Sequence, residues 1–216
     1  MDASGPVEDV ARVDDAQRRF VSAITSVQFD PTAPCALPGW TIGHLLAHVA
    51  RNADSHVRRA EAAERGEVVE QYTGGYAGRA AEIEAGASAS VAEMVDDVRR
   101  SGDELAEVWE RLSRSAWAMT THDVGGRSRP LRSLPGRRWQ ELEVHLVDVQ
   151  LGVTYRDWSD DFVAAWLPHL RTSLASRLPT GARPPGSDDF GDTRDELVWL
   201  YGRLRRDDLP TLVGWG

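Results

Sequence analysis

Apolar residues recur at helical spacing in four long stretches, and this periodicity constrains the fold more than any other feature of the chain. Side chains three and four positions apart share one face of an α-helix, and an apolar face must pack against another. Thr41 is placed to cap the second stretch, and Ser90, with Glu93 three residues later, to cap the third. Four long amphipathic helices predict a four-helix bundle. The stretches cover about residues 7–27, 41–67, 88–112 and 134–151.

The connections within the predicted bundle are uneven in length and composition. Residues 71–79 are rich in glycine and tyrosine and are expected to form a loop. Residues 114–133 are long for a bundle connection, and long ordered loops are often functional. A short strand is expected there, near residues 117–124.

After the fourth stretch the pattern changes. A helix is expected over about residues 157–178, then a loop rich in proline and glycine, then a short helix over 194–204. We therefore divide the 216-residue chain into a bundle domain, residues 1–154, and a small C-terminal subdomain, residues 155–216, for which we expect α+β structure.

The charge balance narrows the classes of partner. Asp and Glu number 34 against 25 Lys and Arg, which gives a formal net charge of −9. Such a chain repels phosphate backbones, so no nucleic-acid partner is expected. No stretch is long and apolar enough to predict a membrane span, and the acidic start of the chain does not resemble a secretory signal. We expect a cytoplasmic protein, either a monomer or a homodimer.

Cysteine and lysine usage excludes several chemistries. Cys35 is the only cysteine, which rules out an internal disulfide and a Cys-rich zinc site. It lies in a proline-flanked loop without a basic neighbour in sequence to lower its pKa, so it is not expected to be a nucleophile. The chain contains no lysine, and Schiff-base catalysis needs a lysine amine.

Metal-ligand side chains occur at one-turn spacing in two predicted helices. Glu141, His145 and Asp148 share a face of the fourth, and His44 and His48 lie four apart in an apolar part of the second. A carboxylate and imidazoles on facing helices can hold one divalent ion, and zinc accepts both ligand types. Hydrogen-bonded core histidines are the alternative interpretation. The spacing does not decide between His44 and His48.

Three blocks of the sequence resemble one enzyme family. PGWTIGHLLAHVARNAD, RAAEIEAGA and RRWQELEVHLVDVQLG are similar, in order and spacing, to the mycothiol-dependent maleylpyruvate isomerases of the DinB-like metalloenzyme superfamily. The resemblance covers about residues 15–155 and continues weakly in the tail, in ELVWLYGR and DLP. It implies a mainly α fold, in which a DinB-like four-helix bundle precedes the small subdomain.

The resemblance also implies a metal site. In the family, a zinc ion is held by the second histidine of H-x-x-x-H and by both residues of E-x-x-x-H, which are His48, Glu141 and His145 here. His44 then becomes a candidate catalytic residue of the pocket or a core histidine. Asp148 could orient a neighbouring side chain or form a buried ion pair.

The implied cofactor is mycothiol, a low-molecular-weight thiol, and the implied substrate is a small dicarboxylate. Arg79 and Arg203 are the candidates to bind its carboxylates, because an arginine can bind a carboxylate through two N–H groups. Asn52 and Tyr76 are candidates to bind the thiol. With so many arginines in the chain, surface charge is the alternative interpretation for either one.

The function implied by the resemblance is the conversion of maleylpyruvate to fumarylpyruvate by reversible thiolate addition. Zinc would hold the thiol as a thiolate or polarise the substrate carbonyl, and the sequence does not choose between these roles. A thiol S-transferase of the same superfamily, which joins mycothiol or another thiol to an electrophile, would have nearly the same site. A non-catalytic metal-binding interaction domain is a further alternative, against which the intact set of three ligands argues.

Overall fold

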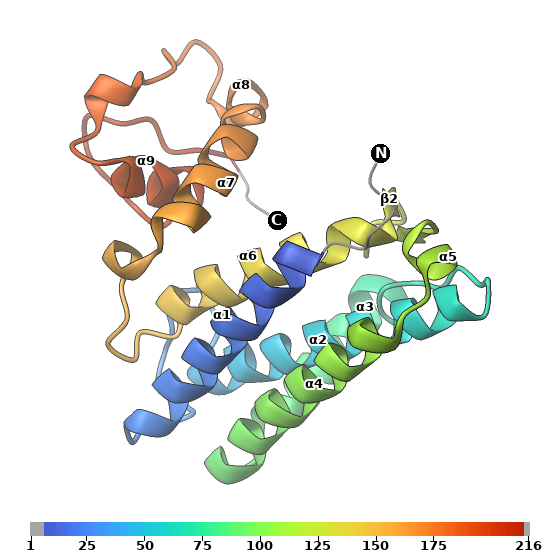
Figure 1. Ribbon diagram of the computed structural model, residues 1–216. Coiled ribbons are helices and arrows are strands. Elements are labelled where there is room, and N and C mark those ends of the chain that lie inside the picture. Colours follow the sequence, from blue (N-terminus) through green and yellow to red (C-terminus); the bar gives the residue numbers. More distant parts are fainter. Residues whose placement is uncertain (1–6, 214–216) are drawn as a thin grey trace. The chain divides into compact units, whose positions relative to one another are not determined.

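The chain forms two compact units in the computed structural model (Figure 1). The structure describes residues 7–213. The first unit ends at Gly152 and the second begins at Val153, two residues before the boundary expected from the sequence. The described residues are mainly helical, as predicted, and their sheet has two strands.

Four long helices form the bundle of the first unit, and they are the four that the periodicity predicts. α1 packs against α6 and α4, and α2 packs against the same two helices (Figure 1). Their apolar faces meet in a core that contains the fully buried side chains of Phe20, Leu45, Leu105 and Leu142. The four helices are α1 (Val7–Ser26), α2 (Ile42–Glu64), α4 (Val91–Arg111) and α6 (Leu134–Asp148).

Side-chain caps begin α2 and α4 at the predicted residues. The Ser90 hydroxyl accepts a hydrogen bond from the backbone N–H of Glu93, whose carboxylate accepts one from the backbone N–H of Ser90. Thr41 and His44 make the same reciprocal pair, in which the His44 Nδ1 atom is the returning acceptor. These bonds satisfy N–H groups that have no partner inside the helix. They fix the residue at which each helix starts.

A further helix, α3 (Gly75–Ala87), packs against α2. The loop predicted over residues 71–79 is therefore wrong in its second half. α3 fully buries only Ile83, so it lacks the apolar stripe that reveals a helix in a sequence. One glycine permits the close approach of the two helices, since a Cβ atom at Gly86 would lie 2.8 Å from the Cβ atom of Ala47.

The long connection between α4 and α6 contains a small hairpin, in the region where the sequence predicts a strand. Its two strands are antiparallel, with Thr121 opposite Arg129. Asp123 closes the turn by accepting hydrogen bonds from the backbone N–H groups of Gly125 and Arg127. The elements are α5 (Arg114–Trp117), β1 (Thr120–His122), β2 (Ser128–Pro130) and the 3-10 helix η1 (Leu131–Ser133).

Three aromatic side chains form the centre of the second unit. The ring centroids of Trp158, Phe162 and Tyr201 lie 5.4–6.4 Å apart, and all three rings are buried. Aromatic groups of this size supply much of the apolar area that a small unit can bury. The elements of the unit are η2 (Tyr155–Asp157), α7 (Asp160–Arg171), α8 (Leu174–Arg177), η3 (Ser187–Asp189) and α9 (Thr193–Leu200).

Two details of the second unit differ from the sequence predictions. The helix expected over residues 157–178 is two helices, because the chain turns at Thr172 and Ser173 between α7 and α8. The expected α+β character is not found within the described residues 153–213, and the strand pair belongs to the first unit. Proline has no N–H group for a strand ladder, and residues 179–186 contain three prolines.

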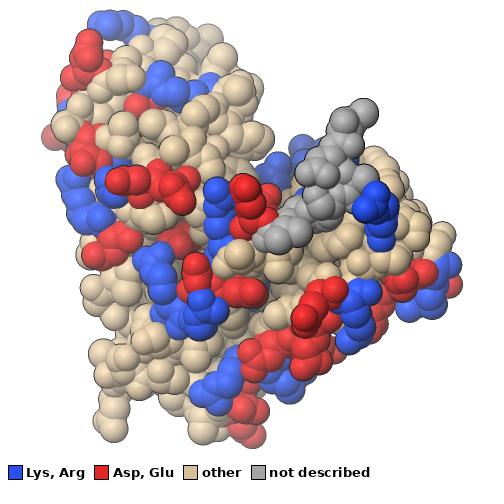
Figure 2. Space-filling view, viewed as in Figure 1, with Lys and Arg blue, Asp and Glu red and all other residues tan. Residues whose placement is uncertain are grey.

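The outward face of α4 carries mixed charge. Acidic and basic side chains alternate along this helix in the space-filling view (Figure 2). Arg100, for example, forms ion pairs with Asp97 and Glu104 on neighbouring turns. Exposed pairs of this kind contribute little to stability, so α4 is held by its buried face. None of the described helices is both long enough and apolar enough to cross a membrane.

A buried arginine joins α6 to two other helices. Arg138 has 0% exposed surface and donates hydrogen bonds to the carbonyl oxygen of Val49 at 2.8 Å, to Oδ1 of Asn52 at 2.9 Å and to Oε1 of Gln17 at 3.1 Å. Burial lowers the pKa of this guanidinium to about 10. Among the described residues it has no ion-pair partner, so these neutral acceptors offset the cost of burying the cation.

We expect the substitution Arg138→Ala to lower the free energy of unfolding by about 2–4 kcal/mol, because it opens a cavity and removes the donor from Asn52 and Gln17. Urea denaturation measures this change. The control is Arg99→Ala at an exposed position of α4, which should alter the free energy by less than about 0.5 kcal/mol. Equal effects of the two substitutions would show that the buried guanidinium does not stabilise the bundle.

Candidate metal centre

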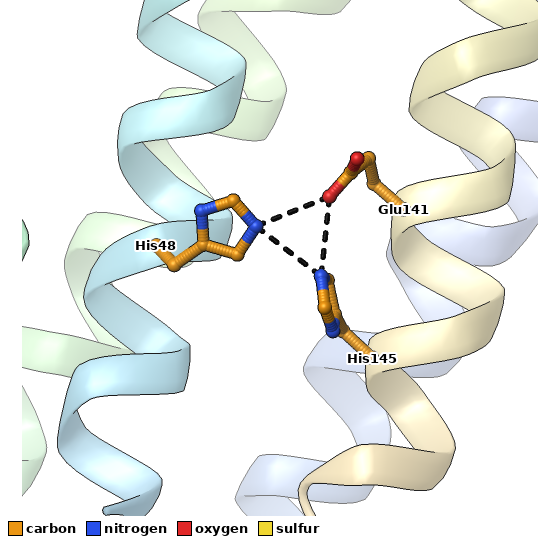
Figure 3. Close-up of side chains that lie close together, drawn as sticks. All are labelled: His48, Glu141 and His145. Atoms are coloured by element: carbon orange, nitrogen blue, oxygen red, sulfur yellow. Dashed lines mark hydrogen bonds and ion pairs between the residues drawn. The ribbon is translucent and has the colours of Figure 1, made fainter. Parts of the chain in front are cut away.

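Two histidines and a glutamate from two helices converge on one point in the first unit (Figure 3). His48 projects from α2, and Glu141 and His145 project from α6. Nε2 of His48 lies 3.1 Å from Oε2 of Glu141 and 3.2 Å from Nε2 of His145, and the latter two atoms are 3.1 Å apart. In the described part of the chain, this is the one group of three such side chains that could share a metal ion. We refer to it as the triad.

The packing of α2 and α6 directs the triad inward. Glu141 and His145 are four residues apart on α6 and therefore share a face. The neighbouring side chains Leu142 and Leu146 are buried. Side chains of His48 and His145 are only 5% and 7% exposed, whereas that of Glu141 is 29% exposed. The triad is thus closed around its imidazoles and accessible beside its carboxylate.

Burial and mutual contact change the pKa of each triad group. Burial lowers the pKa of His48 to about 4. Burial acts in the same direction on His145, but hydrogen bonds with Asp148 and Glu141 outweigh it and raise the pKa to about 9. Burial raises the pKa of Glu141, and the two imidazoles outweigh that effect and hold it well below its usual value. An anionic carboxylate and a neutral His48 are the protonation states in which these groups bind metals.

The spacing of the triad atoms fits a tetrahedral zinc ion. Zinc binds nitrogen and oxygen ligands at about 2.0–2.2 Å, so two ligand atoms of a tetrahedron lie about 3.3 Å apart. The three separations of 3.1–3.2 Å are close to this value. Three protein ligands leave a fourth coordination position for water or a small molecule.

The second ring nitrogens of the two histidines have opposite partners. Nδ1 of His145 lies 3.0 Å from Oδ2 of Asp148, a fully buried carboxylate. A carboxylate in this position orients a ligating imidazole and makes it a better donor to a metal. Nδ1 of His48 instead lies 3.2 Å from a terminal nitrogen of Arg79. The triad therefore has an anion on the side of α6 and a cation on the side of α3.

Arg79 lies between two aromatic rings beside the triad. Its guanidinium carbon is 5.8 Å from the centre of the Trp40 ring and 5.9 Å from that of the Tyr72 ring. The Trp40 ring also meets the His48 ring edge-on, at 5.5 Å. Stacking on aromatic faces restricts the orientation of a guanidinium. Trp40 was not predicted as a site residue from the sequence, although its position next to the cap of α2 is a signal that could have revealed it.

His44 forms its hydrogen bonds with residues outside the triad. Its Nδ1 atom takes part in the cap of α2 with Thr41, and its Nε2 atom lies 3.1 Å from a carboxylate oxygen of Glu84 on α3. Both ring nitrogens thus have partners other than Glu141 and His145. The geometry brings His48, and not His44, together with Glu141 and His145, which the spacing of the two histidines did not decide.

The other candidates for binding substrate or thiol occupy different surroundings. Asn52 is buried and accepts its hydrogen bond from Arg138. Tyr76, near the start of α3, is 65% exposed. Arg203 lies in the second unit, where it donates a hydrogen bond to the carbonyl oxygen of Tyr201 at 2.6 Å. Of the first-unit candidates among the described residues, Arg79 is the one that contacts the triad.

The chain also matches a known protein family. Residues 10–150 match the family described as the mycothiol maleylpyruvate isomerase N-terminal domain. The chain belongs to this family. The matched region contains the whole triad and Arg79, so the resemblance noted in the sequence is confirmed. No curated protein sequence matches the chain significantly.

Two solved structures share the fold of this member of the mycothiol maleylpyruvate isomerase family. One is a crystal structure of the mycothiol-dependent maleylpyruvate isomerase, with 21% identity and a TM-score of 0.80. The other is a mutant form of the mycothiol-dependent maleylpyruvate isomerase, with 20% identity and a TM-score of 0.83. Each match covers 97% of this chain and 93% of the other. The likeness confirms the DinB-like helical fold.

We expect His48→Ala to lose stoichiometric metal and His44→Ala to retain it, because only the first removes an atom from the triad. Elemental analysis of the purified variants after loading with zinc measures the bound metal. Circular dichroism checks that both variants keep the helical fold. Retention of metal by His48→Ala, or its loss from both variants, would contradict the assignment of ligands.

We expect Asp148→Asn to weaken metal binding by about 10–100-fold, because a neutral amide orients the ligating imidazole less well than a carboxylate. Competition with a chelator measures the affinity. Glu143→Gln is a matched control, since Glu143 is a buried carboxylate of the same helix that faces Arg19 rather than His145. An equal loss of metal affinity in the two variants would show that Asp148 has no special role in metal binding.

Proposed function

We propose that the protein is a zinc-dependent and mycothiol-dependent cis–trans isomerase that converts maleylpyruvate to fumarylpyruvate. The observation that supports this most directly is the triad of His48, Glu141 and His145, which lies inside the region that matches the family. Three protein ligands with a fourth position open are typical of catalytic rather than structural zinc. The solved relatives of the same fold are described as an isomerase that depends on mycothiol.

The proposed reaction turns a double bond into a single bond for long enough to rotate. Bound mycothiol would supply a thiolate that adds to one alkene carbon, with the alkene electron pair moving into the conjugated carbonyl group. The former double bond would then be single and free to rotate. Loss of the same thiolate would restore the double bond in the trans geometry and regenerate the thiol. A bound zinc ion would hold the thiol as a thiolate or polarise the substrate carbonyl.

The cysteine of the chain is not placed to supply this thiolate. Sγ of Cys35 lies 3.5 Å from the carbonyl oxygen of Trp40, an acceptor that favours the protonated thiol over the thiolate. Cys35 is also not part of the metal-ligand group found among the described residues. We therefore assign the nucleophile to an external thiol.

We assign Arg79 to one carboxylate of the substrate. It is half-buried beside His48 and, among the described residues, forms no ion pair. An arginine can bind a carboxylate through two parallel N–H groups, and Trp40 and Tyr72 would hold the guanidinium plane in place.

We expect zinc-loaded protein to isomerise maleylpyruvate only when mycothiol is added, and we expect His145→Ala to lose both metal and activity. A spectrophotometric assay of fumarylpyruvate formation, with and without the thiol and after treatment with a chelator, measures this. Circular dichroism of His145→Ala controls for folding. Full turnover by metal-free protein would contradict the metal dependence.

Two other outcomes would redirect the assignment. Isomerisation without any added thiol would contradict the role of mycothiol. Conjugation of mycothiol to an electrophile without isomerisation would make the protein an S-transferase, which uses the same activated thiolate and differs in the fate of the adduct. Product analysis by mass spectrometry distinguishes an adduct from an isomer.

A further inference from the structure

The outer hydrogen bond of His48 has the wrong direction for a metal ligand. A histidine that ligates a metal almost always donates the N–H of its other ring nitrogen to a carboxylate, a carbonyl oxygen or water. His145 fits this rule, because its Nδ1 atom lies 3.0 Å from Oδ2 of Asp148. Nδ1 of His48 lies 3.2 Å from a terminal nitrogen of Arg79, and a guanidinium can only donate. In this contact Nδ1 of His48 is therefore the acceptor.

The acceptor role of Nδ1 fixes where the neutral His48 ring carries its proton. A neutral imidazole has one N–H, so that proton is on Nε2. Nε2 lies 3.1 Å from Oε2 of Glu141, which can accept it. An Nε2 atom that gives its lone pair to a metal cannot keep a proton, and the neutral ring then carries it on Nδ1. The hydrogen bond from Arg79 and metal ligation by His48 thus exclude each other, although the charge of neither group changes.

Two N–H groups face each other when His48 acts as a ligand. One is on Nδ1 of His48 and the other is on Arg79, and neither can accept from the other. The side chain of His48 is only 5% exposed, so water has little access to its ring. A buried donor without an acceptor is costly. A group that accepts from both sides would remove this cost.

The surroundings of Arg79 favour an acceptor that comes from outside the chain. Arg79 forms no ion pair with any of the described residues and is only half-buried. The rings of Trp40 and Tyr72, 5.8 and 5.9 Å from its guanidinium carbon, limit how far it can turn away. One oxygen that accepts from two nitrogens at about 2.8 Å holds them about 4.5–5 Å apart, so Arg79 needs to retreat by only about 1.5 Å.

We propose that a carboxylate oxygen binds between Arg79 and Nδ1 of His48 when His48 ligates the metal, so that metal and carboxylate each strengthen the binding of the other. The carboxylate would give His48 the partner that Asp148 gives His145. In the metal-free protein Arg79 stays on His48 and the carboxylate site is closed. The inference rests on the proposed function, because it takes the triad as the zinc site, and it adds a coupling between zinc and an anionic substrate.

The test measures this coupling with maleate, a cis-dicarboxylate, in buffers free of other carboxylates. Chelator competition at a fixed free zinc concentration gives the zinc affinity with and without maleate. Isothermal titration calorimetry gives the maleate affinity of the metal-free and the zinc-loaded protein, and the two routes must yield the same factor.

Arg79→Ala removes the donor, and Arg51→Ala is the matched control. Arg51 lies three residues after His48 and carries the same charge, but it pairs with Asp54 and Asp97 instead of contacting the triad. Circular dichroism checks the fold of both variants. A proton–nitrogen correlation spectrum of the imidazole rings shows which nitrogen of His48 carries the proton.

We expect maleate to raise the zinc affinity of the wild type by about fivefold or more, and zinc to raise the maleate affinity by the same factor. Arg79→Ala should bind zinc more tightly than the wild type in the absence of maleate, and maleate should then add little. Arg51→Ala should keep the coupling of the wild type. The proton of His48 should be on Nε2 in the metal-free protein and on Nδ1 in the protein loaded with zinc and maleate.

Several results would overturn the inference. Equal coupling in the wild type and in Arg79→Ala would show that maleate acts at the zinc ion and not at Arg79. Loss of coupling in Arg51→Ala as well would assign the effect to overall charge. Independent binding of zinc and maleate, no binding of maleate, or a metal-free His48 with its proton on Nδ1 would each contradict it too.

Failure of the inference is distinguishable from failure of the proposed function. Zinc-loaded protein that lacks the coupling but isomerises maleylpyruvate with mycothiol would leave the proposed function intact. A wild-type protein that holds no stoichiometric zinc would overturn the proposed function, and the coupling with it.

Discussion

The hydrogen bonds of the buried Arg138 guanidinium fix α6 against α2 at the level of the triad, whose geometry depends on this contact. Arg138 lies one turn before Glu141, and its acceptors on α2 belong to Val49 and Asn52, which follow His48. A slide of one helical turn moves a side chain by about 5.4 Å. Such a slide would separate triad atoms that are 3.1–3.2 Å apart. Apolar contacts alone tolerate small slides, whereas the rigid fork of a guanidinium does not.

The three triad residues have different surroundings. Asp148 supplies a buried anion behind His145, Arg79 supplies a cation beside His48, and Glu141 faces the accessible side. A candidate metal ligand and a candidate substrate-binding group therefore lie next to each other. This arrangement suits a reaction in which a thiol and an anionic substrate must meet at one centre.

The features that could be predicted from the sequence are those that depend on residues close together in the chain. The long bundle helices were predictable because their apolar stripes determine their packing, and the cap residues marked where two of them start. α3 was missed because it fully buries only Ile83 and so shows no apolar stripe. The choice of His48 over His44 was not physically predictable, since both lie on one face of α2. The cap and Glu84, from separate parts of the chain, decide it.

The cap of α2 also limits how homologous chains can vary in length. Thr41 fixes the first turn of the helix, and His48 reaches α6 because a set number of residues separates it from that start. One residue inserted or deleted between them would turn His48 by about 100° around the helix axis. The connection after α2, at residues 65–70, has no such constraint and can lengthen at little cost. Insertions and deletions among relatives that keep the triad should therefore spare the short segment from Thr41 to His48.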